Sequence, residues 1–143
     1  MAKTQKPFPM EKLFRVLADR TRLRLLNLMR GQEICVCYLV EVLQTSQPKI
    51  SRHLAYLRNA GIVAARPEGK WMHYRVLPPG DPIAGRILRE IQAWLAEDRA
   101  MRRDKRRLTK ACCRPQKFVR LSHAPPPTTL GPSDMETPRA VRA

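Results

Sequence analysis

Apolar residues recur at helical spacing in four stretches of the first sixty residues. Within each stretch they fall at intervals of three and four, which places them on one face of an α-helix. Asp19 stands where a side chain can cap the second helix, and Gly31 stands where that helix can end. Pro48 lies in the first turn of the fourth helix, where proline is tolerated. The pattern predicts helices over residues 10–18, 20–30, 35–43 and 47–59.

The third and fourth predicted helices are separated by only three residues, 44–46, which are polar. Two helices joined by so short a turn are typical of a helix-turn-helix, whose second helix enters the major groove of DNA. Polar side chains on that second helix that point away from its apolar face are candidates for base and phosphate contacts. These candidates are Gln47, Lys49, Ser51, Arg52 and Tyr56.

Two β-rich segments follow, residues 62–66 and 71–76, and a turn sequence that contains Gly69 joins them. A hairpin directly after a helix-turn-helix is a natural candidate for a wing. We expect Arg66 and Lys70 of this hairpin to touch the DNA backbone beside the second helix. The fold predicted from these elements is mainly α with a β-hairpin wing, a winged helix-turn-helix.

One long amphipathic helix is predicted to begin at Asp81 or Pro82 and to continue through a charged stretch to about Leu108. Few residues remain elsewhere in the chain to cover its apolar face. We therefore expect the first and last helices to pair across the two-fold axis of a homodimer, whose two recognition helices would match a palindromic operator. The apolar positions concerned are Leu13, Leu17, Ile83, Ile87, Leu88, Ile91, Trp94 and Leu95.

Composition divides the 143-residue chain into three parts. Residues 1–8 form a short polar leader, and residues 9–108 hold all the predicted elements in one domain, which suits a chain with room for one small core. Residues 109–143 form a cysteine-containing, proline-rich tail that we expect to be largely disordered, above all from residue 118.

The formal net charge is +16, and the last 45 residues contribute 12 basic residues against three acidic ones. A chain this basic is normally held near a polyanion such as nucleic acid. No apolar run is long enough to span a bilayer, and the first eight residues lack the apolar core of a signal peptide, so we expect a cytoplasmic protein without a membrane partner. In that reducing compartment the four cysteines are expected to serve as ligands or reactive thiols rather than disulfides.

Three stretches of this chain resemble the ArsR/SmtB family of metal-sensing bacterial repressors. They are LADRTR at 17–22, QPKISRHL at 47–54 and LRNAGIV at 57–63, and the likeness extends over residues 9–100. Three motifs in one order are far more specific than a single helix-turn-helix pattern. The resemblance implies a dimeric repressor that binds double-stranded operator DNA.

The stretch EICVCYL at 33–39 is similar to the arsenic-responsive branch of that family. This resemblance implies that Cys35 and Cys37 bind As(III) or Sb(III) and that the ligand releases the repressor from its operator. Relatives in this branch often carry a third cysteine three residues after the second, where this chain has Val40. Cys112 or Cys113 could replace it, from the same subunit or from the partner.

Cys35 and Cys37 would point about 200° apart on a regular helix, since each residue turns the helix by roughly 100°. We therefore hypothesise that one ligand gripping both thiols distorts the start of the third helix and moves the recognition helix. DNA and ligand would then bind antagonistically.

Two alternatives within the same fold stay open, because thiolates also bind Cd(II), Pb(II) and Zn(II), and because thiols can act as an oxidation switch. His53 and His73 are expected to be packing residues rather than metal ligands. An enzyme is not expected, because the chain has no nucleophile elbow, phosphate-binding glycine loop or cofactor fingerprint.

Overall fold

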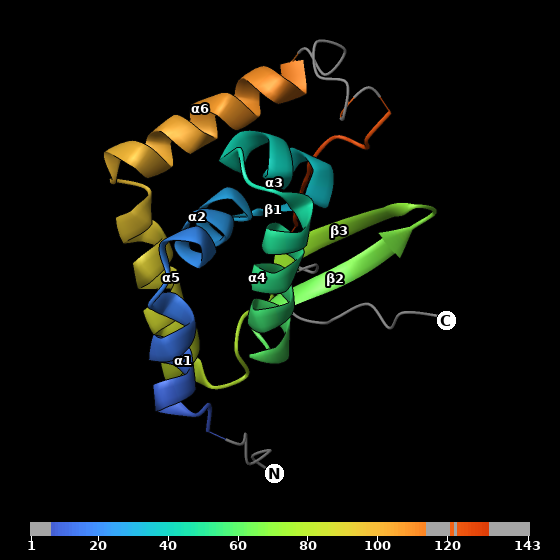
Figure 1. The fold of residues 1–143 in the computed structure, drawn as a ribbon. Coiled ribbons are helices and arrows are strands. Elements are labelled where there is room, and N and C mark those ends of the chain that lie inside the picture. Colours follow the sequence, from blue (N-terminus) through green and yellow to red (C-terminus); the bar gives the residue numbers. More distant parts are fainter. Residues whose placement is uncertain (1–6, 114–120, 122, 132–143) are drawn as a thin grey trace.

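The computed structural model describes residues 7–113, 121 and 123–131 (Figure 1). Six helices and four strands form the described part of the chain. In chain order they are α1 (Met10–Leu17), α2 (Arg20–Leu28), β1 (Gln32–Cys35), α3 (Val36–Leu43), α4 (Gln47–Asn59), β2 (Val63–Glu68), β3 (Trp71–Val76), α5 (Pro82–Leu95), α6 (Arg99–Cys113) and β4 (Thr128–Thr129). The predicted winged helix-turn-helix is confirmed, with α3 and α4 as its two helices and β2–β3 as the wing.

Aspartate side chains cap α2 and α5 where the sequence predicts these helices to begin. The Asp19 carboxylate accepts a 2.9 Å hydrogen bond from the backbone N–H of Arg22 and caps α2. The Asp81 carboxylate does the same for α5, accepting from the N–H groups of Ile83 and Ala84, and it also accepts from Phe8 N–H in front of α1. Asp81 therefore ties the beginning of the first helix to the beginning of the fifth.

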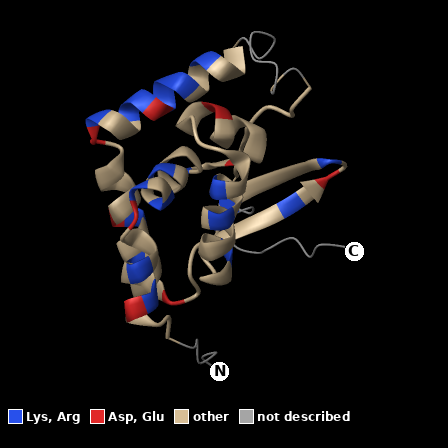
Figure 2. Cartoon of the chain, viewed as in Figure 1, with Lys and Arg blue, Asp and Glu red and all other residues tan. Residues whose placement is uncertain are grey.

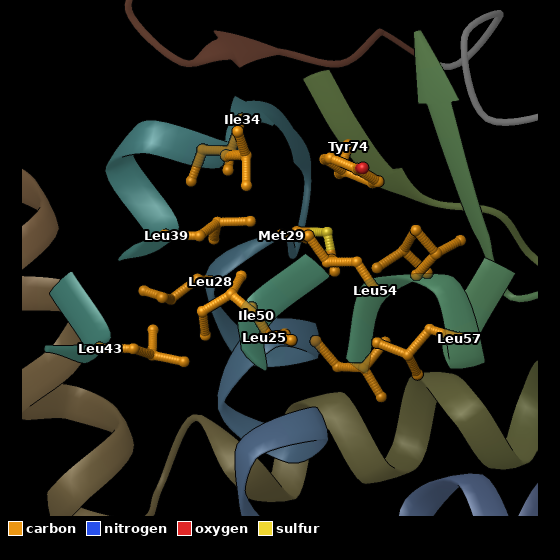
Figure 3. Packing of buried hydrophobic residues seen from close by; sticks show 14 of the residues in the cluster. Leu25, Leu28, Met29, Ile34, Leu39, Leu43, Ile50, Leu54, Leu57 and Tyr74 are labelled. Atoms are coloured by element: carbon orange, nitrogen blue, oxygen red, sulfur yellow. The ribbon is translucent and has the colours of Figure 1, made fainter. Parts of the chain in front are cut away.

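The core lies where α2, α3 and α4 converge (Figure 3). Leu28 of α2 lies near Leu39 of α3, Leu25 lies near Ile50 of α4, and the apolar face of α4 closes the cluster. That face consists of Ile50, Leu54 and Leu57, the three buried residues of α4. The opposite face of α4 is consequently left to solvent.

A four-stranded antiparallel sheet in the order β2-β3-β1-β4 packs beside this core. In its register Cys35 lies opposite His73, and Ile34 lies opposite Tyr74. Because side chains alternate along a strand, Ile34 and Tyr74 share the face toward the core, while Cys35 and His73 share the other. The strand β1 was not predicted, and it places Cys35 in a sheet.

The expectation of one long helix from Asp81 or Pro82 to about Leu108 was wrong. The chain leaves α5 after Leu95, and Asp98 starts a separate helix by accepting hydrogen bonds from the N–H groups of Ala100 and Met101. Helix α6 then runs in a new direction to Cys113 (Figure 1). A capping aspartate within the charged stretch therefore divides the predicted helix in two.

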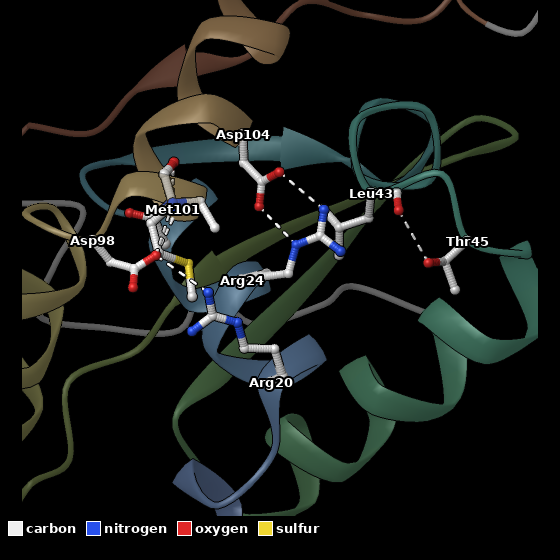
Figure 4. A network of polar contacts seen from close by, with 9 residues as sticks. Arg20, Arg24, Leu43, Thr45, Asp98, Met101 and Asp104 are labelled. Atoms are coloured by element: carbon white, nitrogen blue, oxygen red, sulfur yellow. Dashed lines mark hydrogen bonds and ion pairs between the residues drawn. The ribbon is translucent and has the colours of Figure 1, made fainter.

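Helix α6 is held against α2 by buried polar contacts (Figure 4). The Arg24 guanidinium donates two hydrogen bonds to Asp104, at 2.7 and 2.9 Å, and the Asp104 side chain is 1% exposed. Nearby, the Asn27 amide donates to the carbonyl of Met101. These contacts fix the position of α6, and with it the two cysteines of its last turn.

The described residues that follow α6 add to the core and to the sheet. Leu121 and Ala124 are buried, and Thr128 and Thr129 pair with Glu33 and Gln32 at the outer edge of β1. Most of residues 118–143, for which we expect disorder, lie outside the described residues. No helix in the described ranges is long and apolar enough to cross a membrane.

Candidate thiol site and DNA-binding surface

Cys35 and Cys37 lie on either side of the junction between β1 and α3. Cys35 is the last residue of β1 and is fully buried, whereas Cys37 lies in the first turn of α3 and is half-buried. Burial is the main cause that raises the pKa of Cys35 to about 11, and the charge of the neighbouring Cys37 thiolate raises it further. The two thiols are thus already together, so the expectation that a helix would point them apart was wrong, because Cys35 is not helical.

Cys112 and Cys113 lie in the last turn of α6 rather than beyond the helix, where we expected them. Cys112 is half-buried and packs against the core, whereas Cys113 is exposed. Burial, followed by the neighbouring Cys113, raises the pKa of Cys112. The two adjacent thiols therefore have different surroundings.

Tyr38 connects the thiol pair to α6. Burial raises the pKa of its phenol most, and the thiols of Cys112, Cys35 and Cys37 raise it further because all three are near enough to repel the phenolate. Cys113 is not among these neighbours of Tyr38. Within the described ranges, no three Cys, His, Asp or Glu side chains are close enough together to hold one metal ion. The three thiols therefore all influence one phenol, but they do not form a ligand set.

Helix α4 presents to solvent most of the side chains selected from the sequence. Gln47, Lys49 and Arg52 are exposed, and Ser51 is half-buried. Tyr56 is also exposed, but the Arg22 guanidinium lies 4.4 Å from the centre of its ring. The exposed polar row agrees with a helix that enters a groove, and Arg22 of α2 is an adjoining cation that the sequence analysis did not select.

The two selected wing residues differ in their surroundings. Lys70 is exposed at the tip of the hairpin, with its ammonium 5.0 Å from the Trp71 ring. Arg66 instead donates to the Glu33 carboxylate at 2.6 and 2.9 Å and to Glu68 at 3.2 Å. Hydrogen bonding to Glu33 raises the pKa of Arg66. Lys70 is therefore available to a DNA phosphate, whereas Arg66 is engaged within the sheet.

Sequence reasoning missed a polar link between the wing and the thiol site. Glu33 lies two residues before Cys35 on the same face of β1, and Arg66 joins it to β2. The Nε2 atom of buried His73 lies 3.0 Å from Glu68 but makes no hydrogen bond there. His53 lies 3.7 Å from Asp19 and packs beside the α2 cap. Pairing between distant strands brings the wing residues together, and no local sequence pattern reports such pairing.

Large apolar side chains remain exposed on α1 and α5. Phe14 is 53% exposed, Ile83 68% and Trp94 72%, although Leu13 and Leu17 are buried within the single chain. Of the other residues expected at a dimer surface, Ile83 and Trp94 are exposed and Ile87 and Ile91 are half-buried, whereas Leu88 and Leu95 are buried within the chain. Met10 and Phe14, which were not expected there, add exposed apolar surface on α1.

Comparison with known proteins agrees with this geometry. A family model described as "Bacterial regulatory protein, arsR family" matches residues 19–65. The "Arsenical resistance operon repressor" of Escherichia coli K12 is 44% identical over 102 residues, which cover 71% of this chain and 86% of the relative. The "Arsenic resistance transcriptional regulator ArsR1" of Pseudomonas putida is 45% identical over 91 residues, covering 60% and 71% respectively.

The fold has solved counterparts as well. HlyU from Vibrio cholerae superposes with a TM-score of 0.52 at 26% identity, over 59% of this chain and 88% of that one. The transcriptional regulator HlyU from Vibrio vulnificus gives a TM-score of 0.50 at 28% identity, over 59% and 84%. The relatives and neighbours are transcriptional regulators rather than enzymes. This chain belongs to the arsR family of bacterial regulatory proteins.

Proposed function

We propose that this chain is a repressor that binds operator DNA as a homodimer and is released when As(III) or Sb(III) binds its cysteine thiolates. The observation that carries the proposal is the placement of Cys35 and Cys37 at the junction of β1 and α3, with Cys112 of α6 half-buried against the same core. Helix α3 leads directly into the DNA-facing helix α4. The Escherichia coli relative, whose name is that of an arsenical resistance repressor, supports the metalloid as ligand.

Cys112 supplies the third thiolate in this proposal. Trivalent arsenic and antimony are soft centres that favour sulfur, and several thiolates held by one protein bind far more tightly than one. Cys112 faces the core beside Tyr38, whereas Cys113 in the same helical turn is exposed to solvent. In this proposal, ligand binding moves α6 toward α3 and brings Cys112 to the Cys35–Cys37 pair.

Such a movement would reach the DNA through α3. Helix α3 ends at Leu43, Gln44 after it has a left-handed φ of 53°, and only Thr45 separates Gln44 from Ser46, which occupies the N-cap position of α4. Because this connection is short and buried residues of both helices share one core, a shift of α3 carries α4 with it. If the ligand lowers the affinity for DNA by 10² to 10³, the coupling free energy between the two sites is about 3–4 kcal/mol. The loss of a few phosphate contacts can account for this amount.

The dimer surface in this proposal is the exposed apolar face of α1 and α5. An isologous two-fold contact through Phe14, Ile83 and Trp94 would bury three large side chains that the single chain leaves in water. Two α4 helices related by that axis would read the two halves of a palindromic site. In this proposal the protein binds DNA in the cytoplasm and needs no catalytic cofactor.

The test is fluorescence anisotropy of a labelled promoter fragment bound to the reduced protein and titrated with As(III), Sb(III), Cd(II), Pb(II) or Zn(II). We expect As(III) or Sb(III) to release the DNA from the wild type and from Cys113→Ser, which is the matched control. Release should fail in Cys35→Ser and Cys37→Ser and should need at least about tenfold more ligand in Cys112→Ser.

Other outcomes identify the alternatives. Release by divalent ions alone would retain the repressor and replace the metalloid by Cd(II), Pb(II) or Zn(II). Release by peroxide without any metal would indicate an oxidation switch. If Cys112→Ser and Cys113→Ser respond identically to As(III), the third-ligand assignment is wrong.

A further inference from the structure

Helix α6 carries a ridge of positive charge along its outer face, visible as the blue bands of Figure 2. Seven of its 15 residues are basic, and six of these are exposed. With a turn of roughly 100° per residue, the six side chains fall within an arc of about 140° on one side of the helix. We call this set the basic ridge, and it consists of Arg99, Arg102, Arg103, Arg106, Arg107 and Lys110.

The basic ridge is not neutralised by the described part of the protein. The one acidic residue of α6, Asp104, lies on the buried face and is bound to Arg24. None of the described acidic side chains forms an ion pair with any residue of the ridge. Its members also recur at spacings of three and four, where like charges repel and weaken a helix. A ligand that supplies negative charge along the helix would relieve this repulsion.

The C-terminal half of the ridge borders the helix-turn-helix. An open cleft between the two helices is lined by Glu41, Val42 and Gln44 on the α3 side and by Arg107, Lys110 and Ala111 on the α6 side. Gln44 is the first residue of the turn that leads into α4. Arg107 and Lys110 thus lie next to the turn, whereas Arg99 and Arg102 lie at the other end of α6, beside Asp98 and α2.

We propose that the C-terminal half of the basic ridge, centred on Arg107 and Lys110, is a second DNA-binding surface that holds backbone phosphates alongside the turn. Duplex DNA suits it because its phosphates form a rigid, regular row of negative charge that can continue from the recognition helix onto an adjacent helix. These contacts strengthen binding and carry no sequence information. The inference rests on the proposed binding of operator DNA and adds a surface to it.

The test compares two double variants that remove the same charge from the same helix. Arg107→Gln/Lys110→Gln changes the end next to the turn, and Arg99→Gln/Arg102→Gln is the matched control at the far end. Dissociation constants are measured by anisotropy at several salt concentrations on a labelled promoter fragment and on a random-sequence duplex. Thermal melting by circular dichroism checks that both variants fold.

We expect the turn-end variant to lower the slope of log K against log salt by about 0.9 for each phosphate contact removed, and to weaken binding to both duplexes by roughly tenfold or more near 0.1 M salt. The far-end variant should change both quantities by less than half as much. The single variant Arg107→Lys, which keeps the charge, should retain the wild-type slope.

Two results would overturn the inference while leaving the proposed function intact. In the first, the turn-end variant keeps the wild-type slope of log K against log salt. In the second, the two double variants weaken DNA binding equally, which would mean that the total charge of the protein, and not the position of Arg107 and Lys110, sets the affinity. A wild-type protein that binds neither duplex would instead refute the proposed function, and the two failures are therefore distinguishable.

Discussion

The Arg24–Asp104 pair allows a quantitative prediction about the docking of α6. Asp104→Asn removes the charge from a side chain that is 1% exposed and accepts two hydrogen bonds from one guanidinium. Breaking a buried pair by removing one partner costs about 3–5 kcal/mol. The Arg24 side chain is 22% exposed and can regain some hydration, which reduces the expected cost to about 2–3 kcal/mol. For a chain of this size the melting temperature should fall by roughly 6–10 °C.

Urea unfolding followed by circular dichroism measures this cost, and a double-mutant cycle with Arg24→Met isolates the pair. We expect a coupling free energy of at least about 1.5 kcal/mol between the two positions. Arg20→Met is the control, because Arg20 also joins α2 to the α6 region, yet its pair with Asp98 is exposed. We expect this variant to lose much less stability than Asp104→Asn. A loss below about 0.5 kcal/mol in Asp104→Asn would refute the reasoning that a buried pair anchors α6.

Three further predictions concern DNA binding, dimerisation and the pH dependence of stability. Arg52→Gln should weaken DNA binding by about tenfold or more, whereas Arg66→Gln should weaken it less than about threefold, because Arg66 is engaged with carboxylates of the sheet; anisotropy distinguishes the two. Trp94→Lys should shift the protein toward monomer in sedimentation equilibrium, with dimerisation at least about tenfold weaker, and an unchanged dimer would contradict the proposed surface. The hydrogen bond from Phe8 N–H, followed by those from the start of α5, lowers the pKa of Asp81. Its stabilisation is therefore present above the ordinary carboxyl pKa of about 4 and is lost as the pH falls through the lower folded value. Melting curves of Asp81→Asn should accordingly depend less on pH below about 4 than those of the wild type.

Local patterns were sufficient to predict the elements that residue spacing specifies. Helix α4 has the predicted bounds, and the Asp19 cap lies where expected, because an apolar stripe and a capping side chain are properties of neighbouring residues. The division between α5 and α6 was missed although Asp98 is a capping residue, since the surrounding charges are equally compatible with a continuous helix. Strand β1 was missed because four residues acquire strand geometry only by pairing with β3, far along the chain.

In the candidate site, too, the residue types could be predicted from local sequence, whereas their contacts could not. The four cysteines and the exposed row of α4 could be selected from sequence, but the difference between Cys112 and Cys113 depends on which face of α6 packs against α3. Tyr38 could not be selected, because its electrostatic interaction with the thiol of Cys112 depends on the packing of α6 near α3. Arg66 was selected for its charge, and its engagement with Glu33 depends on a strand pairing that the sequence does not reveal.

The pairing of β4 with β1 affects how this protein can be shortened. A chain cut before Leu121 would keep α1 to α6 and all four cysteines, but it would lose the strand that covers the outer edge of β1. The backbone groups of Gln32 and Glu33 on that edge would then be free to pair with a strand from another molecule. Truncation intended to remove proline-rich sequence would thereby leave an unpaired strand edge two residues from Cys35. We expect such an edge to promote self-association.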